Sequence, residues 1–92
     1  MIWNFEMTDT FGGEANYSWV RRAHVTRAIT RWQARDLALR WAGWIGVKVE
    51  VTELGSDLEI RPRDMAMVLF VSDAEMEAAQ GECVDSMLEG EQ

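Results

Sequence analysis

Residues 65–71 form a continuous apolar run, Met-Ala-Met-Val-Leu-Phe-Val, in a chain of only 92 residues. A short apolar run without alternation is typical of a strand that is buried on both faces, as in the middle of a sheet. A chain of this length forms one domain at most. The run therefore predicts a single sheet whose middle strand is covered from both sides.

Other segments alternate apolar and polar residues with a period of two, which is typical of strands with one buried face. This pattern predicts four further strands, over residues 2–8, 17–25, 47–52 and 58–61. The first two strands are expected to form a hairpin, because Gly12 and Gly13 between them permit turn conformations that other residues avoid.

One segment has a helical period instead. Thr26 is a suitable N-cap, and the pattern predicts a helix over residues 27–42. The stripe expected to face the sheet consists of Thr30, Ala34, Leu37, Ala38, Trp41 and Ile45. Trp32 and Leu39 lie nearly opposite this stripe, so their side chains are expected to be available to a partner.

The end of the chain also predicts a helix. Ser72 followed by Glu75 matches a capping box, with a helix over 73–80 that can continue to 89. The expected fold is therefore α+β, with the order β-β-α-β-β-β. An antiparallel sheet of about five strands carries one long helix, and an acidic helix follows. We divide the chain into a single α+β domain at 1–71 and an acidic C-terminal helix or tail at 72–92.

Composition excludes several classes of protein. No window approaches the roughly 18 apolar residues of a membrane span, and no basic stretch followed by an apolar one marks a secretory signal. The single cysteine, Cys83, excludes an internal disulfide, and with one histidine it cannot complete a Cys/His zinc site. We expect a cytoplasmic protein that uses no metal and no cofactor.

The net charge of −7 is unevenly distributed. Residues 1–46 hold six arginines and four acids, net +2, whereas residues 47–92 hold twelve acids and three bases, net −9. A nucleic-acid-binding domain normally has a basic surface, so direct binding of nucleic acid is not expected.

No constellation of residues indicates catalysis. Ser18, His24 and Asp36 could be combined on paper into a triad, but no nucleophile elbow or oxyanion loop accompanies them. Gly12 and Gly13 lack the lysine and the following helix of a phosphate-binding loop. We therefore expect a protein that is not an enzyme.

The arginines of the expected helix have two possible roles. Arg27, Arg31 and Arg35 recur every four residues and could contact phosphates. The favoured interpretation is that they pair with the acids of the second half, because the net charge opposes nucleic-acid binding.

Two groups of acids are the candidate partner-binding residues. On a helical wheel, four acids of the C-terminal helix fall within one arc, and four more lie around the turn at 55–57. Charge runs of this kind are often only solvated surface. The candidates are Glu75, Glu82, Asp85 and Glu89, then Glu50, Glu53, Asp57 and Glu59, with Trp32 as an apolar anchor.

Three stretches resemble known proteins. Residues 9–22 read D-T-F-G-G-E-A-N-Y-S-W-V-R-R and, with residues 39–47 and 55–62, are similar to short proteins of bacteriophages and integrated mobile elements. The resemblance covers roughly residues 1–71 and extends to small anti-CRISPR proteins of Pseudomonas-type elements that act on type I systems. It implies a non-enzymatic inhibitor in the cytoplasm of a host bacterial cell. It transfers no functional residue to the acidic tail.

The resulting expectation is a monomer that binds the basic DNA-binding surface of a type I CRISPR effector complex and blocks target DNA by acidic mimicry. The alternative is a small protein–protein interaction module, or a homodimeric accessory protein that uses the face around Trp32.

Overall fold

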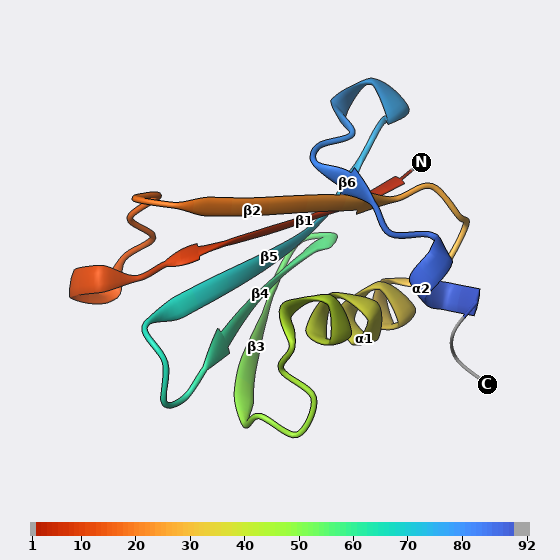
Figure 1. Ribbon diagram of the computed structural model, residues 1–92. Coiled ribbons are helices and arrows are strands. Elements are labelled where there is room, and N and C mark those ends of the chain that lie inside the picture. The colour runs from red at the N-terminus through yellow and green to blue at the C-terminus, as the bar shows by residue number, and fades with distance from the viewer. Residues whose placement is uncertain (1, 90–92) are drawn as a thin grey trace.

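The computed structural model describes residues 2–89 of the chain. It is an α+β fold with one main helix packed on a six-stranded, mostly antiparallel sheet (Figure 1). The strand order is β3-β4-β5-β1-β2-β6. The strands are β1 (Ile2–Asp9), β2 (Val20–Val25), β3 (Val49–Leu54), β4 (Asp57–Pro62), β5 (Met67–Ala74) and β6 (Glu82–Cys83), the α-helices are α1 (Arg31–Ala42) and α2 (Ser86–Glu89), and the 3₁₀ turns are η1 (Phe11–Gly13) and η2 (Met76–Ala78).

The predicted fold class is confirmed, including the central position of the apolar run. β5 pairs antiparallel with both β1 and β4, and its Val68, Leu69 and Val71 are fully buried. The sheet also has a strand that was not predicted. β6 pairs in parallel with β2 at Ala23 and His24, so the end of the chain extends the sheet.

The apolar side of the sheet faces α1. Trp3, Phe5 and Met7 of β1 point to this side, as their alternation predicts, and belong to one core cluster with the buried residues of α1. The ring centroids of Phe5 and Trp41 lie 5.9 Å apart. The helix buries Ala34, Leu37, Ala38 and Trp41. Ile45, expected to continue this stripe, is instead 69% exposed because it lies beyond the end of the helix.

The predicted start of α1 is wrong by four residues. The N-cap is Thr30, whose hydroxyl accepts from the Gln33 amide at 3.1 Å while the Gln33 side chain accepts from the Thr30 amide at 2.8 Å. Distant contacts hold the preceding residues out of the helix. The indole of Trp3 donates to the Ile29 carbonyl at 3.2 Å, and the Thr26 amide donates to Asp85 at 2.8 Å.

The long C-terminal helix is also absent from the part of the chain that the structure describes. Ser72, its expected N-cap, lies within β5, because β5 continues to Ala74 in register with Ile2 of β1. Inter-strand hydrogen bonds therefore replace the capping box. Only α2 is helical beyond this point, and Val84 just before it is buried in the main core. The helical wheel that grouped the tail acids does not apply.

The second strand is shorter than expected for a local reason. Residues 17–25 were predicted as strand, but β2 begins at Val20. Tyr17 has a φ of 56°, in the left-handed region, and this value interrupts an extended strand.

Candidate functional site

The residues considered for catalysis serve separate structural contacts. Nδ1 of His24 lies 3.0 Å from the Gln80 carbonyl oxygen. The Ser18 amide donates to Asp9, and Asp36 pairs with Arg35. Within residues 2–89, no hydrogen bond joins any two members of the conceivable Ser18–His24–Asp36 set, and no group of three metal-ligating side chains comes together.

The acids of β3 and β4 are largely neutralised by arginines. Three ion pairs hold them: Glu50 with Arg63 at 3.7 Å, Glu53 with Arg31 at 2.7 Å, and Glu59 with Arg61 at 3.0 Å. The fourth acid, Asp57, accepts a hydrogen bond from the Asp73 amide at 3.1 Å. Three of the four acids therefore have an arginine as counter-charge, whereas Asp57 forms no ion pair among residues 2–89.

Two of the three arginines expected on the helix follow the ion-pair interpretation, although Arg27 lies before the start of α1. Arg31 pairs with Glu53, and Arg27 pairs with Glu89 at 3.3 Å. Arg35 instead pairs with Asp36, the next residue along α1.

Trp32 lies on the solvent side of α1 and is 43% exposed. The guanidinium carbons of Arg31 and Arg35 lie 4.8 Å and 5.2 Å from its ring centroid. Such cation–π contacts orient an exposed ring. Because Arg31 also binds Glu53, the structure brings two predicted site residues, Trp32 and Glu53, to one place.

The C-terminal acids have a different environment. Residues 72–89 contain six acids and no base, and among these acids only Glu89 forms an ion pair within the described chain. Oε1 of Glu82 accepts from the Trp41 indole at 3.1 Å, and this neutral donor supplies no counter-charge. Glu75 and Glu77 are exposed, and their side chains have no hydrogen-bond or ion-pair partner among residues 2–89. Sequence reasoning missed Glu77, because the helical wheel placed it off the acidic arc.

Asp85 serves as an anchor for the chain. It accepts hydrogen bonds from both the amide and the hydroxyl of Thr26. Burial acts to raise the pKa of Asp85, but the two bonds from Thr26, together with Cys83 and the charge of Arg27, hold the pKa below its usual value. Asp85 therefore binds the C-terminal segment to the loop before α1 rather than presenting a free carboxylate.

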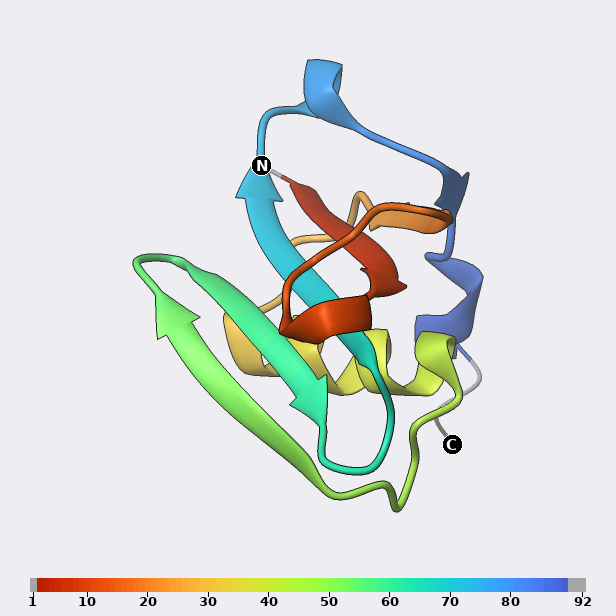
Figure 2. The same cartoon turned by 90° about the vertical axis from the view of Figure 1, so that its left-hand side faces the viewer.

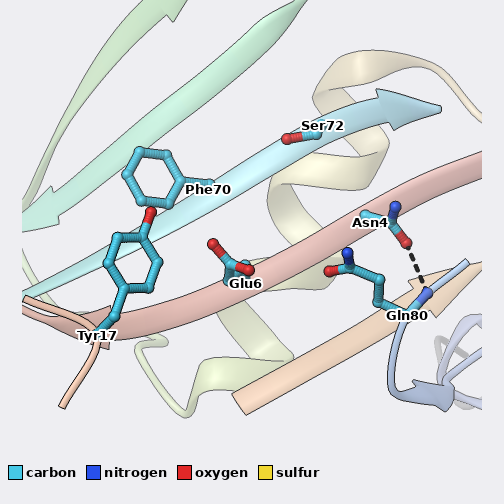
Figure 3. Close-up of a pocket in the computed structure, with 6 residues that line it drawn as sticks. All are labelled: Asn4, Glu6, Tyr17, Phe70, Ser72 and Gln80. Atoms are coloured by element: carbon cyan, nitrogen blue, oxygen red, sulfur yellow. Dashed lines mark hydrogen bonds between the residues drawn. The ribbon is translucent and has the colours of Figure 1, made fainter. Parts of the chain in front are cut away.

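Within residues 2–89, the face of the sheet opposite α1 carries no α-helix (Figure 2). A pocket of about 270 Å³ lies on this face (Figure 3). Strand register produces its floor: Glu6 stands opposite Phe70, and Asn4 stands opposite Ser72. Two loops complete the lining with Tyr17 and Gln80.

Tyr17 is held in place by its neighbours. Asp9 accepts from the Asn16 side chain at 3.2 Å and from the Ser18 amide at 3.3 Å, which fixes the chain on both sides of the left-handed residue. Burial raises the pKa of the Tyr17 phenol, and the Glu6 carboxylate adds to the increase. Burial is the largest single effect on Asp9 and acts to raise its pKa, but the hydrogen bonds from Ser18 and Asn16 together hold the pKa of that carboxyl below its usual value.

The backbone at Gln80, on the opposite side of the pocket from Tyr17, is held by the side chain of Asn4. The Asn4 amide donates to the Ala78 carbonyl at 2.9 Å, and its oxygen accepts from the Gln80 amide at 3.2 Å. Gly81 follows with a φ of 68°, and a Cβ there would lie 1.9 Å from the Arg22 carbonyl oxygen. Only glycine permits this close approach to β2.

No protein-family model matches the chain, and no curated protein and no solved structure matches it either. The longest helix of the described residues, α1, has 12 residues, and none has the length and apolar character needed to cross a bilayer.

Proposed function

We propose that this protein is a non-enzymatic inhibitor that binds a basic, DNA-binding surface of a partner protein. The observation that carries the proposal is the uncompensated negative charge of the segment from η2 to β6. The resemblance of residues 1–71 to phage and mobile-element proteins supports a type I CRISPR effector complex as the target and the host cytoplasm as the compartment in this proposal.

The surface proposed to contact the partner contains fewer acids than the sequence indicated. Three of the four acids of β3 and β4, Glu50, Glu53 and Glu59, are paired with arginines, and these cations offset the negative charge that this surface presents to a basic partner. Glu75, Glu77 and Glu82 form no ion pair with a basic residue among residues 2–89. Met76 lies among them and is 54% exposed, which offers an apolar contact inside a charged surface.

The physical basis is electrostatic complementarity. A DNA-binding groove concentrates positive potential, and a compact anion is attracted to it by the same forces that attract DNA. The protein would then occupy the groove and exclude the target strand. Binding of this type weakens as salt is raised, since exposed charges are screened.

A competition assay with a purified type I effector complex and labelled target DNA tests the proposal. We expect the protein to displace DNA, and the displacement to weaken between about 50 and 300 mM salt.

The variant Glu75→Gln/Glu77→Gln should displace DNA less well. The matched control Glu50→Gln/Glu59→Gln removes two acids that already have arginine partners, and it should act like the unchanged protein. Equal losses in both variants would contradict the assignment to the C-terminal segment, and no displacement by the unchanged protein would overturn the proposed function.

Exposure of Trp32 supports a second candidate, an interaction module that pairs through the solvent side of α1. A large ring held in place by Arg31 and Arg35 has the character of an interface residue. Light scattering separates the two candidates. A stable dimer that Trp32→Ala dissociates would favour the module, whereas a monomer would leave the inhibitor as the better account.

A further inference from the structure

The pocket on the sheet face opposite α1 is held in shape by contacts within the fold. Its six lining residues come from β1, β5 and two loops that are far apart in the sequence. Asp9 clamps the chain around Tyr17, and Asn4 binds the backbone at Ala78 and Gln80. Both ends of the pocket are therefore fixed before any ligand arrives.

The lining has a definite chemical character. It contains one carboxylate, Glu6, two aromatic rings, Tyr17 and Phe70, and no cationic residue. Figure 3 shows the two rings at one end of the pocket, the amides at the other, and Glu6 between them. A carboxylate next to aromatic rings is complementary to a flat cation, which binds the carboxylate through its N–H groups and places its plane against a ring.

The polar groups of the pocket leave room for such a ligand. Arg22 does not line the pocket and donates to Oε2 of Glu6 at 3.0 Å. A carboxylate has two acceptor oxygens, so a guanidinium in the pocket would share Glu6 with Arg22 and bind it through Oε1. The side chains of Ser72 and Gln80 form no hydrogen bond within residues 2–89 and can accept from a donor. Asn4, by contrast, already uses both ends of its amide.

We propose that this pocket binds the guanidinium group of an arginine side chain on the partner protein. The inference rests on the proposed function, because a basic DNA-binding surface is rich in arginine. A nucleotide is the competing ligand for a pocket with aromatic walls. It is disfavoured because the lining has no cation for a phosphate and the whole chain carries a charge of −7.

NMR titration of the isotope-labelled protein tests the pocket without any partner. The probe is a capped Gly-Arg-Gly peptide, and its control is the same peptide with citrulline, which keeps the shape but loses the charge. We expect the arginine peptide to shift the amide signals of Tyr17, Phe70, Ser72 and Gln80 saturably, and the citrulline peptide to do so far more weakly. Equal shifts with both peptides, or tighter binding of adenosine monophosphate at the same amides, would overturn the inference.

Variants assign the effect to the carboxylate. Glu6→Gln should weaken binding of the arginine peptide by about tenfold, the usual scale for losing a charged hydrogen-bond partner. Glu59→Gln is the matched control, since Glu59 stands opposite Phe70 on β4, has its own arginine partner and does not line the pocket. Phe70→Leu keeps an apolar residue but removes a ring, and it should also weaken binding. Unchanged affinity in Glu6→Gln and Phe70→Leu would refute the pocket.

The two proposals fail in different ways. If Glu6→Gln displaces DNA from the effector complex as well as the unchanged protein does, the pocket plays no part in partner binding, and the proposed function stands. If the arginine peptide binds but no effector complex is engaged, the proposed function fails and the chemistry of the pocket stands.

Discussion

The two faces of the sheet are built from different kinds of contact. On the face that packs against α1, residues that recur with a simple period along the chain meet in one apolar core. On the opposite face, a few polar contacts between distant segments hold two loops over the strands, as between Asn4 and Gln80 or Thr8 and Trp19. The apolar face accounts for stability, and the polar face positions the candidate binding pocket.

The largest loss of folding stability is expected for a substitution in the core. Leu37→Ala should lower the free energy of unfolding by about 3 kcal/mol, because Leu37 is fully buried and its loss leaves a cavity. Ile45→Ala is the control from the same predicted stripe. It should cost less than about 0.5 kcal/mol, since Ile45 is exposed. Urea denaturation measures both, and similar losses would mean that α1 does not end where the structure places it.

A glycine substitution tests the close approach of the segment at Gly81 and β6 to β2. Gly81→Ala should cost about 2 kcal/mol, because the new Cβ would overlap the Arg22 carbonyl in a backbone conformation that already disfavours alanine. Gly55→Ala has a similar positive φ but meets no atom within 4 Å, and it should cost less. Amide hydrogen exchange at Val84, which donates to the His24 carbonyl, should rise only in Gly81→Ala. Equal exchange in both variants would contradict the docking of β6.

The helix cap distinguishes the structure from the sequence expectation. Thr30→Ala should cost about 1 kcal/mol, because it removes the acceptor for the Gln33 amide. Faster exchange of that amide is the direct measurement. Thr26→Ala should leave the exchange of Gln33 unchanged, since Thr26 binds Asp85 instead. Faster exchange of the Gln33 amide in Thr26→Ala, with no change in Thr30→Ala, would indicate that Thr26 is the N-cap.

The smallest effect is a pH dependence at Asp85. Its folded pKa lies below the ordinary value of 3.8, so ionised Asp85 stabilises the fold above that pH, and this stability is lost as pH falls through the folded pKa. Asp85→Asn should therefore lower stability at neutral pH and flatten the acid limb of the pH profile. Glu75→Gln, which changes an acid without a partner among the described residues, should leave that limb in place. Thermal unfolding at a series of pH values measures both variants.

Much of the fold could be predicted because its signals are local. The alternation in β1 and the apolar run at 65–71 each predict burial from residues that are adjacent in the chain. Burial is confirmed for the alternating apolar residues of β1 and for Val68, Leu69 and Val71 of β5, whereas Met65 lies before the strand and is 38% exposed. The errors occur where distant contacts override a local signal. Thr26 has the chemistry of an N-cap, but Asp85 binds it, and Ser72 has the same chemistry but lies within a paired strand.

The candidate sites show the same division. Alternation places Glu6 and Asn4 on the outer side of β1, but it cannot tell which residues of β5 stand next to them. That neighbourhood depends on strand register, which brings Phe70 and Ser72 alongside. The acids of the second half were visible as a charge excess, while their division into paired and unpaired groups depended on where each arginine lies in space.

The sequence by itself determined the α+β class, the central buried strand and the excess of negative charge in the second half. These properties follow from composition and from periods of two and 3.6 residues, which act over short stretches of chain. Only the tertiary structure decided which acids are neutralised and where the pocket lies. Ion pairs such as Arg31 with Glu53, and close approaches such as Gly81 against Arg22, join residues far apart in the chain, and no local pattern encodes their distance.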